Sequence, residues 1–229
     1  MNNLNPIEHL SIILDGNKRW AKNKKISFID AYSTGIQNVL IISKELIKKK
    51  IKYFSVFTLS TENLKRTTVN VLFDSIFNQF SIFLEKIIND KKIKIKVIGE
   101  RHNLPTKLNK LITEAEKKTY HHKRLTLILA FNYGFKNEVI SAFKKGYTVV
   151  KNKNNLDDIN LKNLFYLGEI PDPDILIRTG GFKRLSNYLM YNLCYTELFF
   201  TKTLWPDFDK NELENIIEEF QHIKRNYGL

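Results

Sequence analysis

The chain alternates between short strand-like runs and longer stretches in which apolar residues recur every three or four positions. The strand-like runs cover residues 10–14, 51–59, 93–98, 125–131 and 174–178. Between them, helical spacing predicts helices over residues 30–50 and 69–88, a helix after Pro105, and one through Val139, Ile140 and Phe143. A last helix is expected from Asp209, with Glu212 as its capping-box partner.

Strands that alternate with helices are typical of an α/β domain, so we predict a mainly parallel central sheet flanked by helices. The 229 residues include only nine Gly and five Pro, and no low-complexity linker divides them. We therefore expect one domain over residues 1–229. In such sheets, ligands bind beyond the carboxyl ends of the strands, which is where a functional site is expected.

The net charge limits the classes of ligand that the protein is expected to bind, but it does not select one. It is +13, from 37 Lys plus Arg against 24 Asp plus Glu. A basic surface attracts nucleic acid, anionic lipid or phosphorylated metabolites. The excess is mostly lysine scattered along the chain, and we find no basic motif of a known nucleic-acid-binding module. The charge favours an anionic ligand, and nucleic acid is not expected as a partner.

The single cysteine, Cys194, excludes an internal disulfide framework and a multi-cysteine zinc site. Its apolar and aromatic neighbours favour a buried structural thiol. The first residues lack the charged-then-apolar pattern of a secretion signal, and no stretch is long and apolar enough to span a bilayer. We expect a cytoplasmic protein that can touch the inner face of the membrane peripherally.

Polar clusters follow three of the predicted strands, at residues 15–20, 60–66 and 178–187. All three would share one rim of the sheet. A helix that begins near Asn17 would aim its positive end at this rim. Glycines in the first and third clusters would let backbone N–H groups approach a bulky anion, and they are Gly16, Gly180 and Gly181.

Each cluster alone has an ordinary structural explanation, because an Asp-Gly pair is a common turn and Ser-Thr-Glu-Asn a common helix cap. Together the clusters hold four arginines, whose forked donors suit phosphate oxygens, namely Arg19, Arg66, Arg178 and Arg184. Asp15 lies at a strand end among them. Magnesium typically takes one or two carboxylates and completes its shell with phosphate and water. The combination favours a phosphate- and metal-binding site.

In order and spacing, these clusters resemble motifs of the cis-prenyltransferases, the undecaprenyl diphosphate synthase family. The matching segments run through nearly the whole chain: residues 9–21 (HLSIILDGNKRWA), 57–63 (FTLSTEN), 132–134 (NYG), 174–181 (DILIRTGG), 184–187 (RLSN), 197–200 (ELFF) and 205–208 (WPDF). The Asp-Asp-x-x-Asp pairs of the unrelated trans-type enzymes are not found, since Asp157-Asp158 lacks the third carboxylate.

The resemblance implies a Mg²⁺-dependent enzyme that adds isopentenyl diphosphate units to an allylic diphosphate such as farnesyl diphosphate. The product would be a long polyprenyl diphosphate with cis double bonds, expected to be the undecaprenyl carrier lipid of cell-wall synthesis. The helix over residues 69–88 would line an apolar tunnel for the growing chain. A homodimer is implied, because residues 188–208 resemble the family's dimer interface.

The resemblance also assigns roles to single residues. Asp15 would hold Mg²⁺ and help the allylic diphosphate to leave, and Glu197 would be a second metal contact, which a partner subunit can supply. Asn63 matches the family's proton acceptor, but a neutral amide is a poor base, so we interpret it as positioning or relaying the proton. The implied substrate-binding residues are Gly16, Asn17, Lys18, Arg19 and Trp20 for the allylic substrate, and Arg178, Arg184 and Ser186 for isopentenyl diphosphate. Ser60, Thr61 and Glu62 would lie with Asn63 near the reacting carbons, and Arg66 is a further substrate-binding candidate as a phosphate donor.

The chain departs from the family pattern beside the first motif. The arginine that grips a diphosphate is replaced by Phe28, and a histidine by Tyr32. Losing one charged hydrogen bond to phosphate costs on the order of 1.5–3 kcal/mol, roughly ten- to a hundredfold in affinity. A nearby lysine, from Lys18, Lys22, Lys24 and Lys25, can compensate. A polar residue after the Gly-Gly pair is replaced by Phe182.

These departures leave a second hypothesis open, in which the chain is a weakly active scaffold subunit of a heteromeric prenyltransferase. Retention of Asp15, Asn63, Arg178 and Glu197 speaks against it, because a scaffold has no need of them. An active but variant enzyme is the favoured interpretation.

Overall fold

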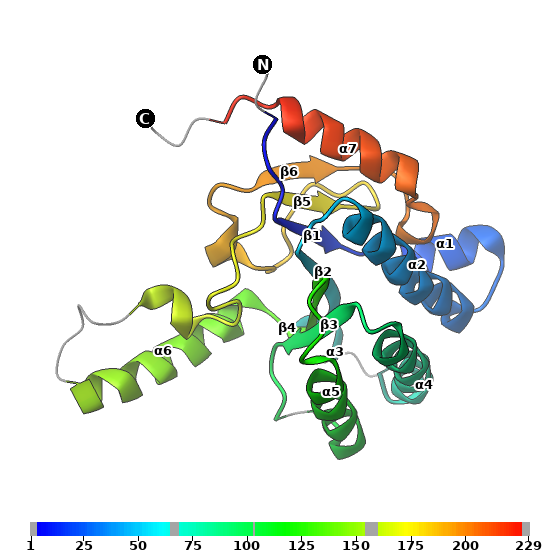
Figure 1. Ribbon diagram of the computed structural model, residues 1–229. Coiled ribbons are helices and arrows are strands. Elements are labelled where there is room, and N and C mark those ends of the chain that lie inside the picture. Colours follow the sequence, from blue (N-terminus) through cyan, green and yellow to red (C-terminus); the bar gives the residue numbers. More distant parts are fainter. Residues whose placement is uncertain (1–3, 65–68, 103, 154–159, 226–229) are drawn as a thin grey trace.

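The computed structural model describes residues 4–64, 69–102, 104–153 and 160–225, and it gives the backbone alone for residues 63–64, 69–77, 150 and 152–153 (Figure 1). Its centre is a six-stranded sheet with the order β3-β4-β2-β1-β5-β6, in which every pairing is parallel. The strands are β1 (His9–Ile13), β2 (Tyr53–Ser60), β3 (Ile93–Ile98), β4 (Leu125–Tyr133), β5 (Ile175–Arg178) and β6 (Glu197–Phe200). The predicted α/β class is confirmed, and the five predicted strands are β1 to β5.

The sixth strand was not predicted from the sequence. β6 is only four residues long, lies at the edge of the sheet beside β5, and is partly exposed. A short half-exposed edge strand lacks the continuous apolar run that marks strands buried on both faces, such as β1.

The helices surround the sheet in the order α1 (Asn17–Lys24), α2 (Phe28–Lys48), α3 (Thr61–Leu64), α4 (Val69–Asp90), α5 (Thr106–Thr119), α6 (Phe135–Lys153) and α7 (Lys210–His222), with 3₁₀ turns η1 (Leu161–Leu164), η2 (Met190–Leu193) and η3 (Trp205–Asp207). Side-chain caps explain where two of them begin. Ser27 accepts the backbone N–H of Asp30 at the start of α2. Asp209 accepts the N–H groups of Asn211 and Glu212 at the start of α7, where the sequence predicted a cap.

The two faces of the sheet are covered differently (Figure 1). One face packs on α2, α4, α5 and α7 through residues such as Ile42, Leu84, Ile112 and Phe220, all fully buried. The other face packs mainly on the segment between α6 and β6, which contributes Leu167, Tyr188, Leu189 and Leu193. Both faces of the sheet are thus covered. The loops after β1, β2 and β5 meet at the carboxyl edge of the sheet.

The predicted helix through Val139 is confirmed, and one side-chain expectation, a buried Cys194, was wrong. Val139, Ile140 and Phe143 lie on α6 as predicted, but they are 41%, 57% and 76% exposed and do not pack on the sheet. Cys194 is exposed as well, with its Sγ near the carbonyl of Tyr191. In the parts of the chain that the structure describes, no helix combines the length and apolarity needed to cross a membrane.

Candidate active site

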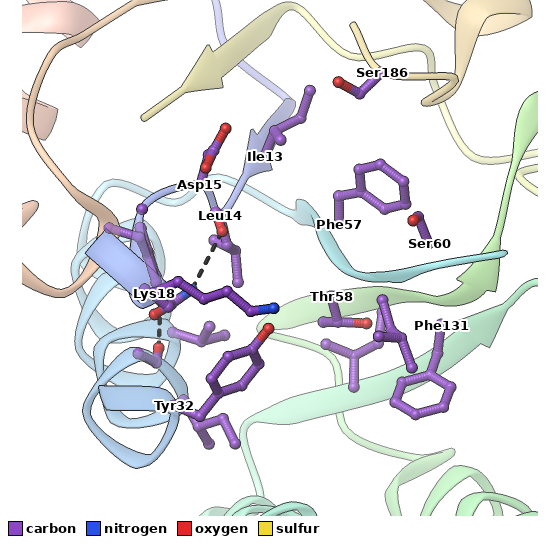
Figure 2. Close-up of a pocket in the computed structure, with 18 of the residues that line it drawn as sticks. Ile13, Leu14, Asp15, Lys18, Tyr32, Phe57, Thr58, Ser60, Phe131 and Ser186 are labelled. Atoms are coloured by element: carbon purple, nitrogen blue, oxygen red, sulfur yellow. Dashed lines mark hydrogen bonds between the residues drawn. The ribbon is translucent and has the colours of Figure 1, made fainter. Parts of the chain in front are cut away.

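A cavity of about 710 Å³ opens at the carboxyl ends of β1, β2 and β5 (Figure 2). This is the edge at which ligands bind in open parallel sheets, and the volume is usual for a ligand pocket. The polar lining comes from Asp15, Asn17, Lys18, Arg19, Tyr32, Thr58, Ser60, Glu62, Arg178, Arg184, Ser186 and Asn187. The apolar lining comes from Ile13, Leu14, Phe28, Ile36, Val39, Phe57, Leu59, Phe80, Phe83, Leu129, Phe131 and Trp205.

Asp15 is the centre of charge in the polar part. Arg178 Nη2 donates to its Oδ2 at 2.7 Å, and Arg19 Nη2 donates to its Oδ1 at 3.2 Å. The Arg178 side chain is only 4% exposed, whereas that of Asp15 is 27% exposed and faces the cavity. The carboxylate therefore gathers two of the predicted arginines at the cavity mouth.

The backbone of Asp15 is fixed from two sides. The Thr179 hydroxyl accepts its N–H at 3.0 Å and donates to its carbonyl at 2.8 Å. The same carbonyl accepts the N–H of Trp205 at 3.0 Å. Trp205 is itself fully buried, and its indole N–H donates to the carbonyl of Gly35 at 2.8 Å. Through these hydrogen bonds the loop after β1 is attached to the end of β5 and, by way of Trp205, to α2.

The predicted helix at Asn17 is confirmed as α1, with Gly16 as its N-cap at φ 118°. The first N–H groups of an α-helix have no partner within the helix and carry its positive end, and here Gly16, Asn17, Lys18 and Arg19 all line the cavity. Gly180 and Gly181 behave differently from the prediction. Their N–H groups donate to the carbonyls of Thr203 and Thr201, at 2.7 Å each, and are not available to an anion.

Arg178, Arg184 and Ser186 are brought together as predicted. Arg178 Nη1 donates to the Ser186 hydroxyl at 2.6 Å and to the backbone carbonyl of Arg184. Arg178 Nε is buried and has no partner within the described residues. All three residues line the cavity, so the loop after β5 presents two guanidinium groups and a hydroxyl at its rim.

The segment after β2 contributes Ser60 and Glu62 to the cavity, whereas Thr61 is buried and lies against Gly134. Asn187 Nδ2 donates to Glu62 Oε1 at 2.9 Å. Burial alone would raise the pKa of Glu62, but hydrogen bonds from its own backbone and from Asn187 outweigh burial and lower that pKa. Glu62 is therefore ionised at neutral pH.

Two of the positions that depart from the family pattern, Phe28 and Tyr32, face the cavity from α2. Phe28 and Tyr32 pack ring on ring with centroids 4.4 Å apart, and Lys18 Nζ lies 5.1 Å from the Phe28 centroid. Figure 2 shows the Lys18 amine and the Tyr32 hydroxyl pointing toward one another. Burial and, after it, the negative charge of Asp15 raise the pKa of Tyr32, so its hydroxyl keeps its proton. Lys22, Lys24 and Lys25 do not line the cavity.

Two further predicted site residues, Trp20 and Glu197, do not line the cavity. The Trp20 indole N–H donates to Asp207 at 2.7 Å, and its side chain does not line the cavity. Glu197 opens β6 opposite Ile175, whereas Arg178, opposite Phe200, stands at the cavity end of the sheet. Glu197 pairs instead with Arg225, so within one chain it lies away from Asp15 and the cavity. Arg66 and the side chain of Asn63 lie outside the described residues.

Sequence reasoning missed several residues that shape the cavity. Asn187 was part of a quoted motif, and its side chain makes two hydrogen bonds. The one to Glu62 ties the loop after β5 to the segment after β2, and the one from the N–H of Lys136 ties it to the start of α6, after β4. Gly35 was not singled out, although a Cβ there would lie 2.5 Å from Asn17 Oδ1. A helical glycine inside an amphipathic pattern was the available signal.

The deeper part of the cavity is apolar and largely aromatic. Phe80 and Phe83 of α4, both buried, face it together with Phe57 of β2 and Phe131 of β4. Leu84, on the same predicted stripe of α4, packs in the core and does not line the cavity. The predicted helix thus serves both purposes, packing on the sheet and lining an apolar space. A continuous tunnel remains a prediction.

Comparison with known proteins agrees with this arrangement. The family model described as "Putative undecaprenyl diphosphate synthase" matches residues 13–228. An isoprenyl transferase of Thermotoga maritima is 36% identical over 224 residues, which is 96% of each chain. A Sulfurisphaera tokodaii protein named tritrans,polycis-undecaprenyl-diphosphate synthase (geranylgeranyl-diphosphate specific) is 38% identical over 231 residues, 96% of this chain and 87% of that protein.

Solved structures show the same fold. A lavandulyl diphosphate synthase from Lavandula x intermedia, in complex with dimethylallyl diphosphate, matches with a TM-score of 0.90 at 28% identity and covers 97% of this chain and 98% of its own. A protein described as "a probable undecaprenyl diphosphate synthase" from Campylobacter jejuni matches with a TM-score of 0.80 at 30% identity, over 99% and 100%. Because the family model spans almost the whole sequence and relatives above 30% identity match over nearly all of it, the chain belongs to the undecaprenyl diphosphate synthase family and is a cis-prenyltransferase.

Proposed function

We propose that the protein is a Mg²⁺-dependent synthase that extends farnesyl diphosphate with isopentenyl diphosphate to a long polyprenyl diphosphate, of undecaprenyl length, for cell-wall carrier lipid. One observation supports this class of substrate: the same cavity is lined by cationic residues such as Arg19 and Arg178 and by aromatic residues such as Phe80 and Phe131. A prenyl diphosphate has the same division, with an anionic head and an apolar tail. Burial of the tail contributes about 0.8 kcal/mol per methylene group.

Asp15 fits a magnesium ion that arrives with its diphosphate. Each carboxylate oxygen accepts one arginine hydrogen bond and keeps a further lone pair. The described residues contain no group of three or more His, Cys, Asp or Glu that would form a closed metal site. Magnesium is often bound by one or two carboxylates with substrate phosphate and water completing the shell. When bound, the ion supplies positive charge that eases departure of the diphosphate.

The chain's own residues then divide the work. Arg19 and the N-terminus of α1 bind the allylic head group, Lys18 and Tyr32 donate to it from the other side, and Arg178, Arg184 and Ser186 bind isopentenyl diphosphate. A carbon–carbon bond forms as the allylic diphosphate leaves and a proton is lost. Glu62, ionised and held by Asn187, places negative charge beside the reacting carbons. Asn63 is assigned the positioning of the departing proton.

An extraction assay tests the activity and the chain length together. Purified protein with Mg²⁺, labelled isopentenyl diphosphate and farnesyl diphosphate is expected to give a ladder that ends at one long product. Geranylgeranyl diphosphate is the second starter to compare, because one relative is named as specific for it. The absence of extension from either starter by folded protein would contradict the proposal. Replacing Asp15 with Asn, which keeps a hydrogen-bond acceptor for the arginines, should lower kcat on the order of a hundred- to a thousandfold.

We also propose a homodimer. Two groups of large apolar side chains are exposed. Val139, Ile140, Phe143 and Tyr147 lie on α6, and Met190, Tyr195 and Leu198 lie on β6 or in the segment just before it. Figure 1 shows α6 extending away from the sheet. Exposed apolar surface of this kind marks interaction sites. Sedimentation should give twice the chain mass, and Phe143→Asp should give one chain mass; a monomeric parent protein would contradict the dimer. In a dimer, Glu197 of one chain is available to its partner's site.

A peripheral membrane contact is proposed at the corner between α1 and α2, where the protein is expected to face the membrane from the cytoplasm. Ile26 and Ile29 are 39% and 40% exposed there, next to Lys22, Lys24 and Lys25. Apolar tips among lysines suit an anionic lipid surface. Co-sedimentation with phosphatidylglycerol vesicles, but not with phosphatidylcholine vesicles, is expected, and Ile26→Ser with Ile29→Ser should weaken it. Equal binding to both vesicles would contradict this contact.

The scaffold hypothesis rests on Phe28 and Tyr32, which do line the cavity. It requires that the chain extend no substrate alone and do so when a second homologous chain is added. The extraction assay on the purified protein decides between the two.

A further inference from the structure

The loop after β5 carries an aromatic side chain among the arginines of the cavity mouth. The guanidinium carbons of Arg184, Arg19 and Arg178 lie 4.2, 4.9 and 5.9 Å from the centroid of the Phe182 ring. All three distances fall within the range in which a guanidinium is attracted by the ring quadrupole. Phe182 is 43% exposed and does not line the cavity itself. Its position is therefore explained by the arginines better than by core packing.

The backbone before Phe182 is rigid. Gly180 and Gly181 have φ of 82° and 81°, a region that favours glycine. Their N–H groups donate to the carbonyls of Thr203 and Thr201 at 2.7 Å each, next to β6. Gly180 also leaves room for Arg19, because a Cβ there would lie 2.4 Å from Arg19 Nη2. The loop thus holds the ring at a fixed place and lets an arginine from α1 reach it.

The charges at the cavity mouth explain why an aromatic ring is a suitable partner for the arginines. Asp15 pairs with Arg178 and Arg19, but within the described residues the guanidinium of Arg184 makes neither an ion pair nor a hydrogen bond. Three like charges around one carboxylate repel one another. A carboxylate in place of the ring would neutralise them and compete with a phosphate ligand. A ring attracts the cations and leaves their N–H donors available.

We propose that Phe182 is a positioning residue that gathers the guanidiniums of Arg19, Arg178 and Arg184 into one diphosphate-binding surface. It acts on the substrates through these arginines. The inference rests on the proposed function for the identity of the ligand, a diphosphate head group, and it adds a residue that the family motif does not supply.

The test compares Phe182→Leu with Phe182→Tyr. Leu keeps apolar volume without the quadrupole, and Tyr keeps the ring as the matched control. Inorganic diphosphate is titrated calorimetrically into each protein, and KM and kcat for isopentenyl diphosphate are measured in parallel. Phe182→Leu should raise the dissociation constant and KM by about five- to a hundredfold, the loss of two to three cation–π contacts. Its kcat should change little and its melting temperature should fall by no more than several degrees, and Phe182→Tyr should stay within about threefold of the parent protein.

A double substitution removes the remaining ambiguity. If the ring works through Arg184, Phe182→Leu should weaken binding less in an Arg184→Met background than in the parent protein. Equal affinities for the Leu and Tyr variants, an effect on kcat alone, no binding of inorganic diphosphate by the parent protein, or full additivity with Arg184→Met would each overturn the inference. A parent protein that makes no polyprenyl product, but whose diphosphate affinity falls in Phe182→Leu, would refute the proposed function and leave this inference standing.

Discussion

Lys18 can be tested as the replacement for the arginine that the family has at position 28. Among the four lysines that could compensate, Lys18 alone lines the cavity of the described residues, with its ammonium 5.1 Å from the Phe28 ring. A charged hydrogen bond to phosphate is worth about 1.5–3 kcal/mol. Lys18→Met should therefore raise KM for the allylic diphosphate roughly ten- to a hundredfold. Lys22→Met is the matched control, because Lys22 lies on the same helix and does not line the cavity.

Phe28→Arg restores the family's arginine, and the structure predicts that its benefit depends on Lys18. The new guanidinium would stand about 5 Å from the Lys18 ammonium, where like charges repel by about 1–3 kcal/mol at effective dielectric constants of about 80 to 20. This is similar in size to the hydrogen bond gained. Phe28→Arg alone should thus change KM little. In the Lys18→Met background the repulsion is absent, so Phe28→Arg should recover most of the lost affinity.

The assay is the steady-state KM for the allylic diphosphate at saturating isopentenyl diphosphate, measured for the four proteins of the cycle. The expected coupling between positions 18 and 28 is about 1–3 kcal/mol. Two results refute the reasoning: an unchanged KM in Lys18→Met, or an equal effect of Phe28→Arg in both backgrounds. Either would mean that Lys18 does not hold the diphosphate.

Further predictions concern the backbone of the site, its acid stability and its metal. Gly180→Ala should lower the melting temperature and raise the diphosphate KM, because φ 82° strains Ala by about 1–3 kcal/mol and the new Cβ displaces Arg19; unchanged values for both would contradict this. Burial lowers the pKa of His9 from 6.5 to about 4. The unfolded chain binds this proton first, so stability present above pH 6.5 is lost as pH falls toward 4, by about 3 kcal/mol. Measured by urea unfolding between these pH values, the free energy of unfolding should fall less steeply with decreasing pH for His9→Gln than for the parent protein. Mg²⁺ should bind more tightly with inorganic diphosphate present than without it, since arginines occupy Asp15 in the free protein; equal calorimetric affinities would exclude this linkage.

Much of the fold could be predicted because buried parallel strands have a plain signature. β1 and β4 are apolar runs, β3 alternates apolar residues with lysine, and the cap at Asp209 is local chemistry. What the sequence left undetermined depended on neighbours that periodicity does not specify. The stripe through Phe143 has helical spacing whether its partner is the sheet, another chain or solvent, and here it is exposed. β6 is too short and too exposed to show a pattern.

The site was predictable to the extent that parallel strands share a carboxyl edge. That rule brought Asp15, Glu62 and Arg178 to one cavity. It could not place Glu197, because only the register of β6 on β5 shows that this residue opens its strand, away from the edge. Nor could it show that the N–H groups of Gly180 and Gly181 are consumed by backbone carbonyls. Those carbonyls belong to residues 201 and 203, which follow β6, a strand that was not predicted from the sequence.

Asp15 connects these observations, because its present partners are also the proposed ligands of the substrates. In the free protein its carboxylate balances Arg178, whose side chain is almost fully buried, and Arg19. A buried charge without a partner is costly, so the arginines can exist at this edge before a ligand arrives. A diphosphate offers them more oxygen acceptors than one carboxylate does. Once they turn to it, Asp15 has lone pairs for a cation. In the proposed mechanism Asp15 therefore serves both states, as partner of the arginines in the free protein and as ligand of the cation when the diphosphate is bound.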